Sequence, residues 1–180
     1  LKISIIQCVW KGKKFPANKL KLFLDNNYCC VKIELWVNPP SQWAGKFRTV
    51  DVTVGDYEPQ PYSKIRGLIK NLCDDLAERL KHLPSLQNEE VFLSELISLL
   101  AWFQHRFVWI HPFRDYNGRV ARLLTNLLLL NLGFPILTIK AETGKDRDRY
   151  VKAMKAGDNY DLSKLESLLA QALKTSLEEI

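Results

Sequence analysis

The sequence predicts an all-α domain that carries one small β-hairpin. Two observations predict this fold class: apolar residues recur three or four apart over most of the chain after residue 62, and alternation with period two is clear only at 47–54. The chain has 180 residues, about the size of one domain, and it contains no internal repeat or low-complexity linker. We therefore expect residues 1–180 to form a single domain. The N-terminal part is the least informative, because 19–24 and 31–37 each fit a helix or a strand.

The alternating segment is expected to form the first limb of the hairpin. Its central residues are Val50, Asp51, Val52, Thr53 and Val54. Gly55-Asp56 is a turn signal. Pro59 and Pro61 keep the returning limb out of a central sheet, because proline cannot donate to a ladder. The expected element is a small edge hairpin over about 47–61.

Two long amphipathic helices are expected next. Ser63 is a good N-cap for the first, whose apolar residues recur three or four apart until Pro84 stops it. The second opens near Asn88, where two glutamates in the first turn complement the helix dipole. It ends at His111-Pro112, because proline cannot continue a helix.

A third helix is expected over 117–132, with Gly133 as its C-terminal cap. This helix is apolar almost all round after Arg122, so we expect it to lie at the centre of the helical bundle. Two further amphipathic segments, about 146–156 and 163–178, complete the all-α part.

Composition excludes several classes of protein. Hydrophobic residues make up 47% of the chain and charged residues 26%, as in ordinary globular domains. The longest apolar run, 123–132, is interrupted by polar residues and is far shorter than the roughly 20 residues of a membrane helix. We therefore expect no membrane partner. The four cysteines form no C-x-x-C pair, so neither a disulfide framework nor a zinc site is expected, and a reducing cytoplasm fits best.

The charge of the chain suits an anionic ligand. The net charge is +6, which favours binding of a nucleotide. The basic residues are spread along the chain, however, and the densest run is the three lysines at 11–14. Nonspecific binding to nucleic acid requires a clustered basic face. We therefore expect no dedicated nucleic-acid partner.

The most informative stretch is 111–122, which reads H-P-F-R-D-Y-N-G-R-V-A-R. A helix N-terminus exposes backbone N–H groups and a partial positive charge, so it suits a phosphate. Asn117 and Gly118 lie where this helix begins. Arg119 and Arg122 are three apart and share one face of the first turn, where their guanidinium groups can hold two phosphate groups.

His111 and Asp115 add reactive chemistry to this stretch. His111 titrates near neutral pH and can take a proton from an attacking hydroxyl. Asp115 offers the hard oxygen ligand that a phosphate-bound Mg²⁺ prefers. Each residue also has a structural interpretation, because histidines at helix ends often pack, aspartates before helices often cap them, and arginines often pair with carboxylates. Arginine in a first turn opposes the helix dipole, which favours an anionic partner.

This stretch resembles the signature of the Fic (Fic/Doc, or Fido) family, H-P-F-x-[DE]-G-N-G-R-x-x-R, and it matches every specified position except one. The resemblance covers residues 43–177, including a segment at 43–61 that looks like the family's target-aligning flap. It implies the helical Fic-type bundle and the activity of a protein adenylyltransferase, which moves AMP from ATP to a Ser, Thr or Tyr hydroxyl of a target protein. The family is chiefly bacterial, so the resemblance also implies a cytoplasmic bacterial protein.

The resemblance implies a role for each matching residue. His111 would be the general base, and Asp115 would hold Mg²⁺ against the phosphates of ATP. The flap at 50–54 would pair with an extended segment of the target, and Phe113 would anchor the loop in the core. Tyr150 would border the adenine or simply pack in the core. The residues expected to bind the nucleotide are Tyr116, Asn117, Gly118, Arg119, Arg122 and Tyr150.

Tyr116 is the one departure from the signature, since it stands where the family has glycine. If the position needs a positive φ, a tyrosine costs about 1–3 kcal/mol of strain. Its ring would also crowd the phosphates or cover the base of the nucleotide. Two alternatives to AMP transfer therefore stay open: transfer of a phosphoryl or other nucleotide-derived group by the same loop, and a catalytically silent Fic-fold module that still binds peptides. Arg119 and Arg122 favour AMP transfer, because the phosphotransferase branch tends to lose the last arginine.

A second departure concerns regulation. Many Fic proteins carry an inhibitory helix with the pattern [ST]-x-x-x-E-[GN], which no segment here fits fully. Thr175 and Glu179 come closest, but Ile180 follows where glycine or asparagine is expected. Inhibition therefore comes from a separate, antitoxin-like chain, comes from a segment outside this sequence, or is absent. The oligomeric state is left open between a monomer and a homodimer.

Overall fold

A computed structural model describes residues 43, 45–84, 87–141 and 143–179 of the chain. The two ambiguous segments, 19–24 and 31–37, lie outside the described residues. The described part contains a 3₁₀ turn, η1 (Tyr62–Lys64), and five α-helices: α3 (Ile65–Lys81), α4 (Glu89–Ile110), α5 (Asn117–Asn131), α6 (Gly144–Gly157) and α7 (Ser163–Glu178). The predicted all-α fold is confirmed.

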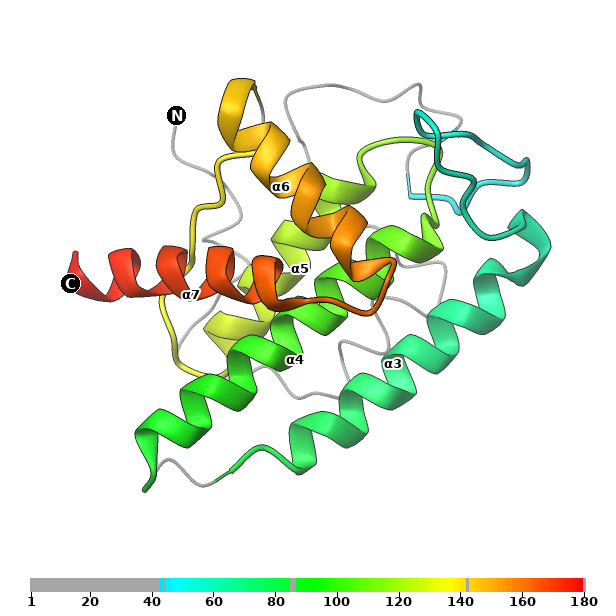
Figure 1. The fold of residues 1–180 in the computed structure, drawn as a ribbon. Helices are drawn as coiled ribbons and strands as arrows, with labels where there is room; N and C mark the ends of the chain where they lie inside the picture. The colour runs from blue at the N-terminus through cyan, green and yellow to red at the C-terminus, as the bar shows by residue number, and fades with distance from the viewer. Residues whose placement is uncertain (1–42, 44, 85–86, 142, 180) are drawn as a thin grey trace.

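α4 is the central helix. It packs against α3, α5 and α7, and Figure 1 shows it running through the middle of the molecule with α3 along one side. The 117–132 helix was expected at the centre: no residue of α5 is exposed, but its fully buried residues lie on one face, and within the described residues it packs mainly against α4. The side chains of α4 with no exposed surface include Leu96, Leu100, Phe103, Phe107 and Ile110.

Local chemistry sets two helix ends where the sequence predicts them. The side-chain oxygen of Asn88 accepts the Val91 N–H at 3.3 Å and caps the start of α4. Gly133 follows the last turn of α5 with a φ of 87°, a conformation that glycine adopts without strain. The Phe134 N–H then donates to the Leu129 carbonyl at 2.9 Å, which satisfies a carbonyl of the last turn.

The predicted Ser63 cap is wrong. Ser63 lies inside η1, and the residue that precedes α3 is Lys64, which makes no side-chain capping hydrogen bond. The Lys64 N–H donates to the Pro61 carbonyl at 2.9 Å. This bond closes a tighter 3₁₀ turn, so the α-helix begins only at the next residue.

The predicted β-hairpin is reduced to a turn with a single bridge. Val54 and Tyr57 exchange two backbone hydrogen bonds, at 2.9 and 3.1 Å, across Gly55-Asp56, and no strand forms within the described ranges. The loop is closed further out by side chains, because the Arg48 guanidinium donates to a carbonyl on each limb and Asp51 Oδ1 accepts the Tyr62 N–H at 2.8 Å. The returning limb lacks two N–H donors at its prolines, so it cannot continue a ladder. We call residues 50–61 the flap.

Two expectations from composition concern the described helices. No helix in the described ranges is both long enough and apolar enough to cross a bilayer. Cys73 is buried in α3, and the other three cysteines lie outside the described residues.

We expect Gly157→Ala to destabilise the fold where the end of α6 meets α4. A Cβ atom at this position would lie 2.5 Å from Cδ2 of His105, whose ring is held by Asp158 Oδ1 at 3.1 Å from Nε2. Overpacking of this kind costs about 1–3 kcal/mol. Gly67→Ala is the matched control, because a Cβ there meets nothing within 4 Å and should add about 0.5–1 kcal/mol of helix stability. Urea unfolding measures both substitutions, and equal effects would contradict the packing.

Candidate functional site

The turn between α4 and α5 is bracketed by two residues in the left-handed conformation. His111 ends α4 with φ 54° and ψ 60°, and its N–H donates to the Phe107 carbonyl at 3.1 Å. Tyr116 precedes α5 with φ 65° and ψ 10°. A non-glycine residue in this region costs about 1–3 kcal/mol, and such strain is concentrated at functional sites. Whether the position of Tyr116 needs a positive φ was left open by the sequence, and the structure shows that Tyr116 adopts one.

Asn117 holds this turn from within. It is 2% exposed, its Oδ1 accepts the Phe113 N–H at 2.9 Å, and its Nδ2 donates to the Phe113 carbonyl at 2.9 Å. The Phe113 ring packs against Phe47 and Phe107, with centroids 5.7 and 6.3 Å apart. The side chain of Asn117 is thus used to shape the turn, and it is the backbone N–H of this residue that remains for an anion.

The N-terminus of α5 presents three backbone donors. The first helical hydrogen bond at this end runs from the Val120 N–H to the Tyr116 carbonyl at 2.9 Å. The N–H groups of Asn117, Gly118 and Arg119 precede it and make no hydrogen bond within the described residues. The first turn contains no acidic residue, and no side chain caps it. These donors, together with the dipole of a 15-residue helix, form a site suited to phosphate oxygens.

His111 is placed as a base with one ring nitrogen available. The residue is 9% exposed, and its Nδ1 donates to the Val108 carbonyl at 3.2 Å. Because a carbonyl can only accept, Nδ1 carries the proton of the neutral ring and Nε2 has the lone pair. Burial lowers the pKa of His111 below 6.5, and the Arg48 charge acts in the same direction, against the Val108 carbonyl and Asp115. The ring is therefore neutral near pH 7.

The Arg119 guanidinium lies over the ring of Tyr116, the residue that stands where the signature has glycine. Its guanidinium carbon is 4.7 Å from the centroid of the Tyr116 ring. No carboxylate among the described residues lies within ion-pair distance of Arg119. A cation–π contact at a partly exposed site is worth about 0.5–1 kcal/mol, which is less than a charge-assisted hydrogen bond to phosphate. Arg119 can therefore leave the ring for a phosphate at little cost.

Arg122 is supported by a chain of buried polar groups. Its guanidinium carbon lies 5.5 Å from the centroid of Tyr150, whose hydroxyl accepts from Gln104 Nε2 at 3.3 Å. Gln104 Oε1 in turn accepts from the Thr125 hydroxyl at 2.9 Å. Burial raises the pKa of Tyr150, against the Arg122 charge, so the phenol stays protonated. Tyr150 is only 7% exposed, which favours a role in positioning Arg122 over direct contact with the adenine of a nucleotide.

Gln104 and Thr125 are functional candidates that the sequence did not single out. Both are fully buried, although each is polar. The available signal was their position, because each lies at a helical spacing otherwise occupied by apolar residues. A buried polar side chain requires a partner, so such positions point to an internal network.

Asp115 fits one ligand position of a phosphate-bound Mg²⁺. The residue is exposed, and its Oδ1 accepts the Tyr116 N–H at 2.6 Å. Oδ2 makes no hydrogen bond within the described residues. Protein sites for Mg²⁺ commonly combine one or two carboxylates with phosphate oxygens and water. One carboxylate beside the phosphate-suited helix end matches that donor set.

The flap lies against the end of α4. The Tyr57 hydroxyl donates to the Trp109 carbonyl at 2.8 Å, and burial raises the pKa of Tyr57 to about 12. Arg48, at the entry to the flap, donates from Nε to the His111 carbonyl at 2.8 Å. The structure therefore brings the flap and His111 together. Arg48 is a further residue to which the sequence assigned no role, because its partner lies 63 residues away.

Val50 and Val54 are 42% and 44% exposed, although both are apolar. The backbones of Val52 and Thr53 make no hydrogen bond within the described residues. The flap thus presents apolar side chains and unpaired backbone groups to its surroundings. These are the features that an extended peptide uses in strand addition.

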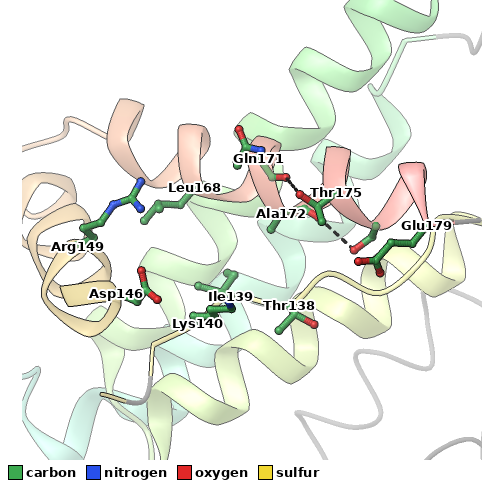
Figure 2. Close-up of a pocket in the computed structure, with 11 residues that line it drawn as sticks. Thr138, Ile139, Lys140, Asp146, Arg149, Leu168, Gln171, Ala172, Thr175 and Glu179 are labelled. Atoms are coloured by element: carbon green, nitrogen blue, oxygen red, sulfur yellow. Dashed lines mark hydrogen bonds between the residues drawn. The ribbon is translucent and has the colours of Figure 1, made fainter. Parts of the chain in front are cut away.

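A separate pocket lies away from this turn. Figure 2 shows it between the 138–140 segment, the start of α6 and the face of α7. Its volume is about 490 Å³. Thr175, whose hydroxyl donates to the Gln171 carbonyl at 3.1 Å, and Glu179 both line it. The lining includes none of the predicted nucleotide-binding residues. The closest match to an inhibitory pattern therefore faces this pocket rather than the arginines of α5.

Comparisons with known sequences agree with the motif. A Fido domain-containing protein from Dictyostelium discoideum is 43% identical over 63 residues, which cover 35% of this chain and 42% of that protein. Protein adenylyltransferase fic-1 from Caenorhabditis elegans is 29% identical over 135 residues, which cover 75% of this chain and 24% of the enzyme. The chain thus spans less than half the length of either relative.

Solved structures agree in fold. Fic-1 (residues 134–508) from C. elegans superposes with a TM-score of 0.62 at 26% identity, covering 78% of this chain and 37% of that one. A Fic domain-containing signaling protein from Bacteroides thetaiotaomicron gives a TM-score of 0.61 at 21% identity, covering 75% and 53%. A family model described as the Fic/DOC family matches residues 30–129, more than half of the sequence. The chain belongs to the Fic/DOC family.

Proposed function

We propose that this chain transfers AMP from ATP to a hydroxyl side chain of a target protein, with His111 as the general base. One observation carries the proposal: a neutral imidazole with a free Nε2 and an uncapped helix N-terminus with no acidic residue belong to the same short turn. Several relatives, including the nematode fic-1 protein, bear the name protein adenylyltransferase. The same turn also supplies two arginines and one carboxylate.

The phosphates of ATP would lie at the start of α5. The N–H groups of Asn117, Gly118 and Arg119 donate to phosphate oxygens, and the Arg119 and Arg122 guanidiniums neutralise further charge. Asp115 would hold Mg²⁺, which when bound would neutralise charge on the phosphates. This arrangement stabilises a phosphoryl centre by positioning and electrostatics, which is most of what such a transfer needs.

The transfer step then requires one proton acceptor. Nε2 of His111 takes the proton from the target hydroxyl as its oxygen forms a bond to the α-phosphorus. The bond between the α-phosphorus and the bridging oxygen breaks, and pyrophosphate leaves with that electron pair. AMP remains attached to the target oxygen. A well-placed base of this kind contributes roughly 10²–10⁴-fold to the rate.

The target would bind along the flap. An extended segment can pair with the backbone of Val52 and Thr53 and cover Val50 and Val54. Backbone pairing selects an extended conformation more than a sequence, so the flap would accept different targets. Four further properties stay predictions from the sequence. They are control by a separate, antitoxin-like chain, assembly as a homodimer, a cytoplasmic location and a bacterial source.

Tyr116 supports a second candidate function. Its ring makes a cation–π contact with the Arg119 guanidinium. The residue stands where the family signature has glycine. If the ring blocks the start of α5, the same turn would move a phosphoryl group from a differently bound nucleotide. If it excludes the nucleotide altogether, the chain would act as a peptide-binding module through the flap.

Labelled ATP distinguishes these functions. The protein is incubated with Mg²⁺ and ATP labelled at either the α- or the γ-phosphate, and label is sought on the protein itself and on lysate proteins. We expect label from the α position only, and a loss of roughly 10²–10⁴-fold in His111→Ala with ATP affinity nearly unchanged. His82→Ala is the matched control, because His82 is an exposed partner of Glu78 at the end of α3. Label from the γ position, or full activity in His111→Ala, would overturn the proposal.

The pH dependence follows from the lowered pKa of His111. The base acts when neutral, and a pKa below 6.5 means that it stays neutral down to more acidic pH than an ordinary histidine. We therefore expect kcat/KM to be level around pH 7 and to fall on the acid side with an inflection below 6.5. Initial rates at saturating Mg²⁺ measure this profile. An inflection above pH 7 would mean that a different group is the base.

Replacement of Tyr116 tests whether its ring competes for Arg119. Tyr116→Gly and Tyr116→Ala both remove the ring, so each should tighten ATP binding by about 2- to 5-fold, the value of an exposed cation–π contact. The two should differ in stability, because alanine at a φ of 65° remains strained and glycine does not. We expect Tyr116→Gly to be about 1 kcal/mol more stable than Tyr116→Ala. Calorimetric titration and urea unfolding measure the two effects, and weaker ATP binding in both variants would show that the ring helps to bind nucleotide.

A further inference from the structure

Arg48 is a buried cation satisfied mainly by backbone carbonyls. Its side chain has no exposed surface, and its nearest carboxylate, Asp51, lies 3.4 Å from Nη1 and is 69% exposed. A buried charge costs free energy unless its donors are satisfied. An apolar side chain would fill the same space without that cost. The value of an arginine here must therefore come from the groups that it holds.

Those groups belong to two different parts of the site. Nη1 donates to the Val50 carbonyl at 3.0 Å and Nη2 donates to the Gln60 carbonyl, so the guanidinium joins both limbs of the flap. Nε donates to the His111 carbonyl at 2.8 Å, and the Arg48 N–H donates to the Pro112 carbonyl at 2.9 Å. One planar side chain thus contacts the base of the flap and the peptide of the proposed catalytic histidine.

The Arg48 guanidinium can transmit a movement of the flap to His111, because its N–H donors are held in one rigid plane. Arginine presents its N–H groups in a fixed fork, so a shift of Val50 or Gln60 rotates Nε as well. His111 is held at φ 54° and ψ 60°, where the direction of its carbonyl and that of its imidazole depend on the same Cα. The ring is buried and makes one hydrogen bond within the described residues, to the Val108 carbonyl, so a shift of the His111 backbone would re-aim it. A misplacement of about 1 Å can cost 10²-fold in rate.

We propose that Arg48 is a positioning residue that couples the flap to the base, so that a target segment bound along the flap fixes the orientation of the His111 ring. The effect of this coupling on catalysis rests on the proposed function. The coupling itself is a property of the fold. Its tests therefore include one readout that needs no turnover.

The first test follows the His111 ring by ¹⁵N NMR of the full chain. Gly55→Ala strains the tip of the flap, because Gly55 has a φ of +60°, and the added Cβ meets nothing within 4 Å. We expect Gly55→Ala to shift the His111 imidazole resonances in the wild-type background and to leave them unmoved in Arg48→Met. Equal shifts in both backgrounds, or no shift in either, would overturn the coupling. Arg48→Lys, which keeps the charge but not the fork, provides a second background if Arg48→Met does not fold, and it should reduce the shift.

The second test measures AMP release from α-labelled ATP with water as the acceptor, so that no target has to be known. We expect kcat to fall about 10²-fold in Arg48→Met and about 10-fold in Arg48→Lys, with KM for ATP within about 2-fold of wild type. Arg79→Met is the control, because Arg79 of α3 stacks on Trp102 of α4, 4.2 Å from the ring centroid. An unchanged kcat in folded Arg48→Met would overturn the positioning role. If wild type releases no AMP to water, the imidazole shifts alone decide the coupling, and the label on protein decides the proposed function.

Discussion

The two hydrogen bonds between the Asn117 carboxamide and the Phe113 backbone are the constraint on which the site depends. They close the turn on itself, so that the chain can leave α4 and enter α5 with its first donors facing outward. Two left-handed residues, His111 and Tyr116, bracket this closed turn. The strain at these positions is tolerated because the surrounding bonds and the Phe113 contacts fix the turn more strongly than the local backbone preference opposes it.

α4 links the parts of the site to the rest of the fold. Its apolar residues form the core, and its last turn places His111. Its buried Gln104 connects Thr125 on α5 to Tyr150 on α6, which lies beside Arg122. A fully satisfied polar chain of this kind resists rearrangement, because each member would be costly to leave unpaired in the interior. The core of the bundle and the orientation of Arg122 therefore depend on the same helix.

The sequence predicted what depends on contiguous residues and missed what depends on distant ones. The turn at 111–122 was recognisable because its histidine, its carboxylate, its arginines and its helix start are all contiguous in the sequence. Helix α7 was predicted with its observed bounds for the same reason. Arg48 was not assigned a role, since its partners are carbonyls that only the fold brings near. The flap shows the same limit: alternation at 50–54 predicted a strand, but a ladder needs donors on the opposite limb, and the prolines remove two of them, so only a single bridge forms. Uniform apolarity in α5 predicted its burial but did not reveal that α4 packs against three of the described helices.

The proposed activity depends most directly on phosphate binding at the start of α5. A crystal structure with ATP and Mg²⁺ tests it. We predict phosphate oxygens on the N–H groups of residues 117–119, Arg119 moved from the Tyr116 ring to a phosphate, and His111 Nε2 facing the α-phosphate. A nucleotide bound only in the pocket lined by α6 and α7, with Arg119 still on the ring, would contradict the account.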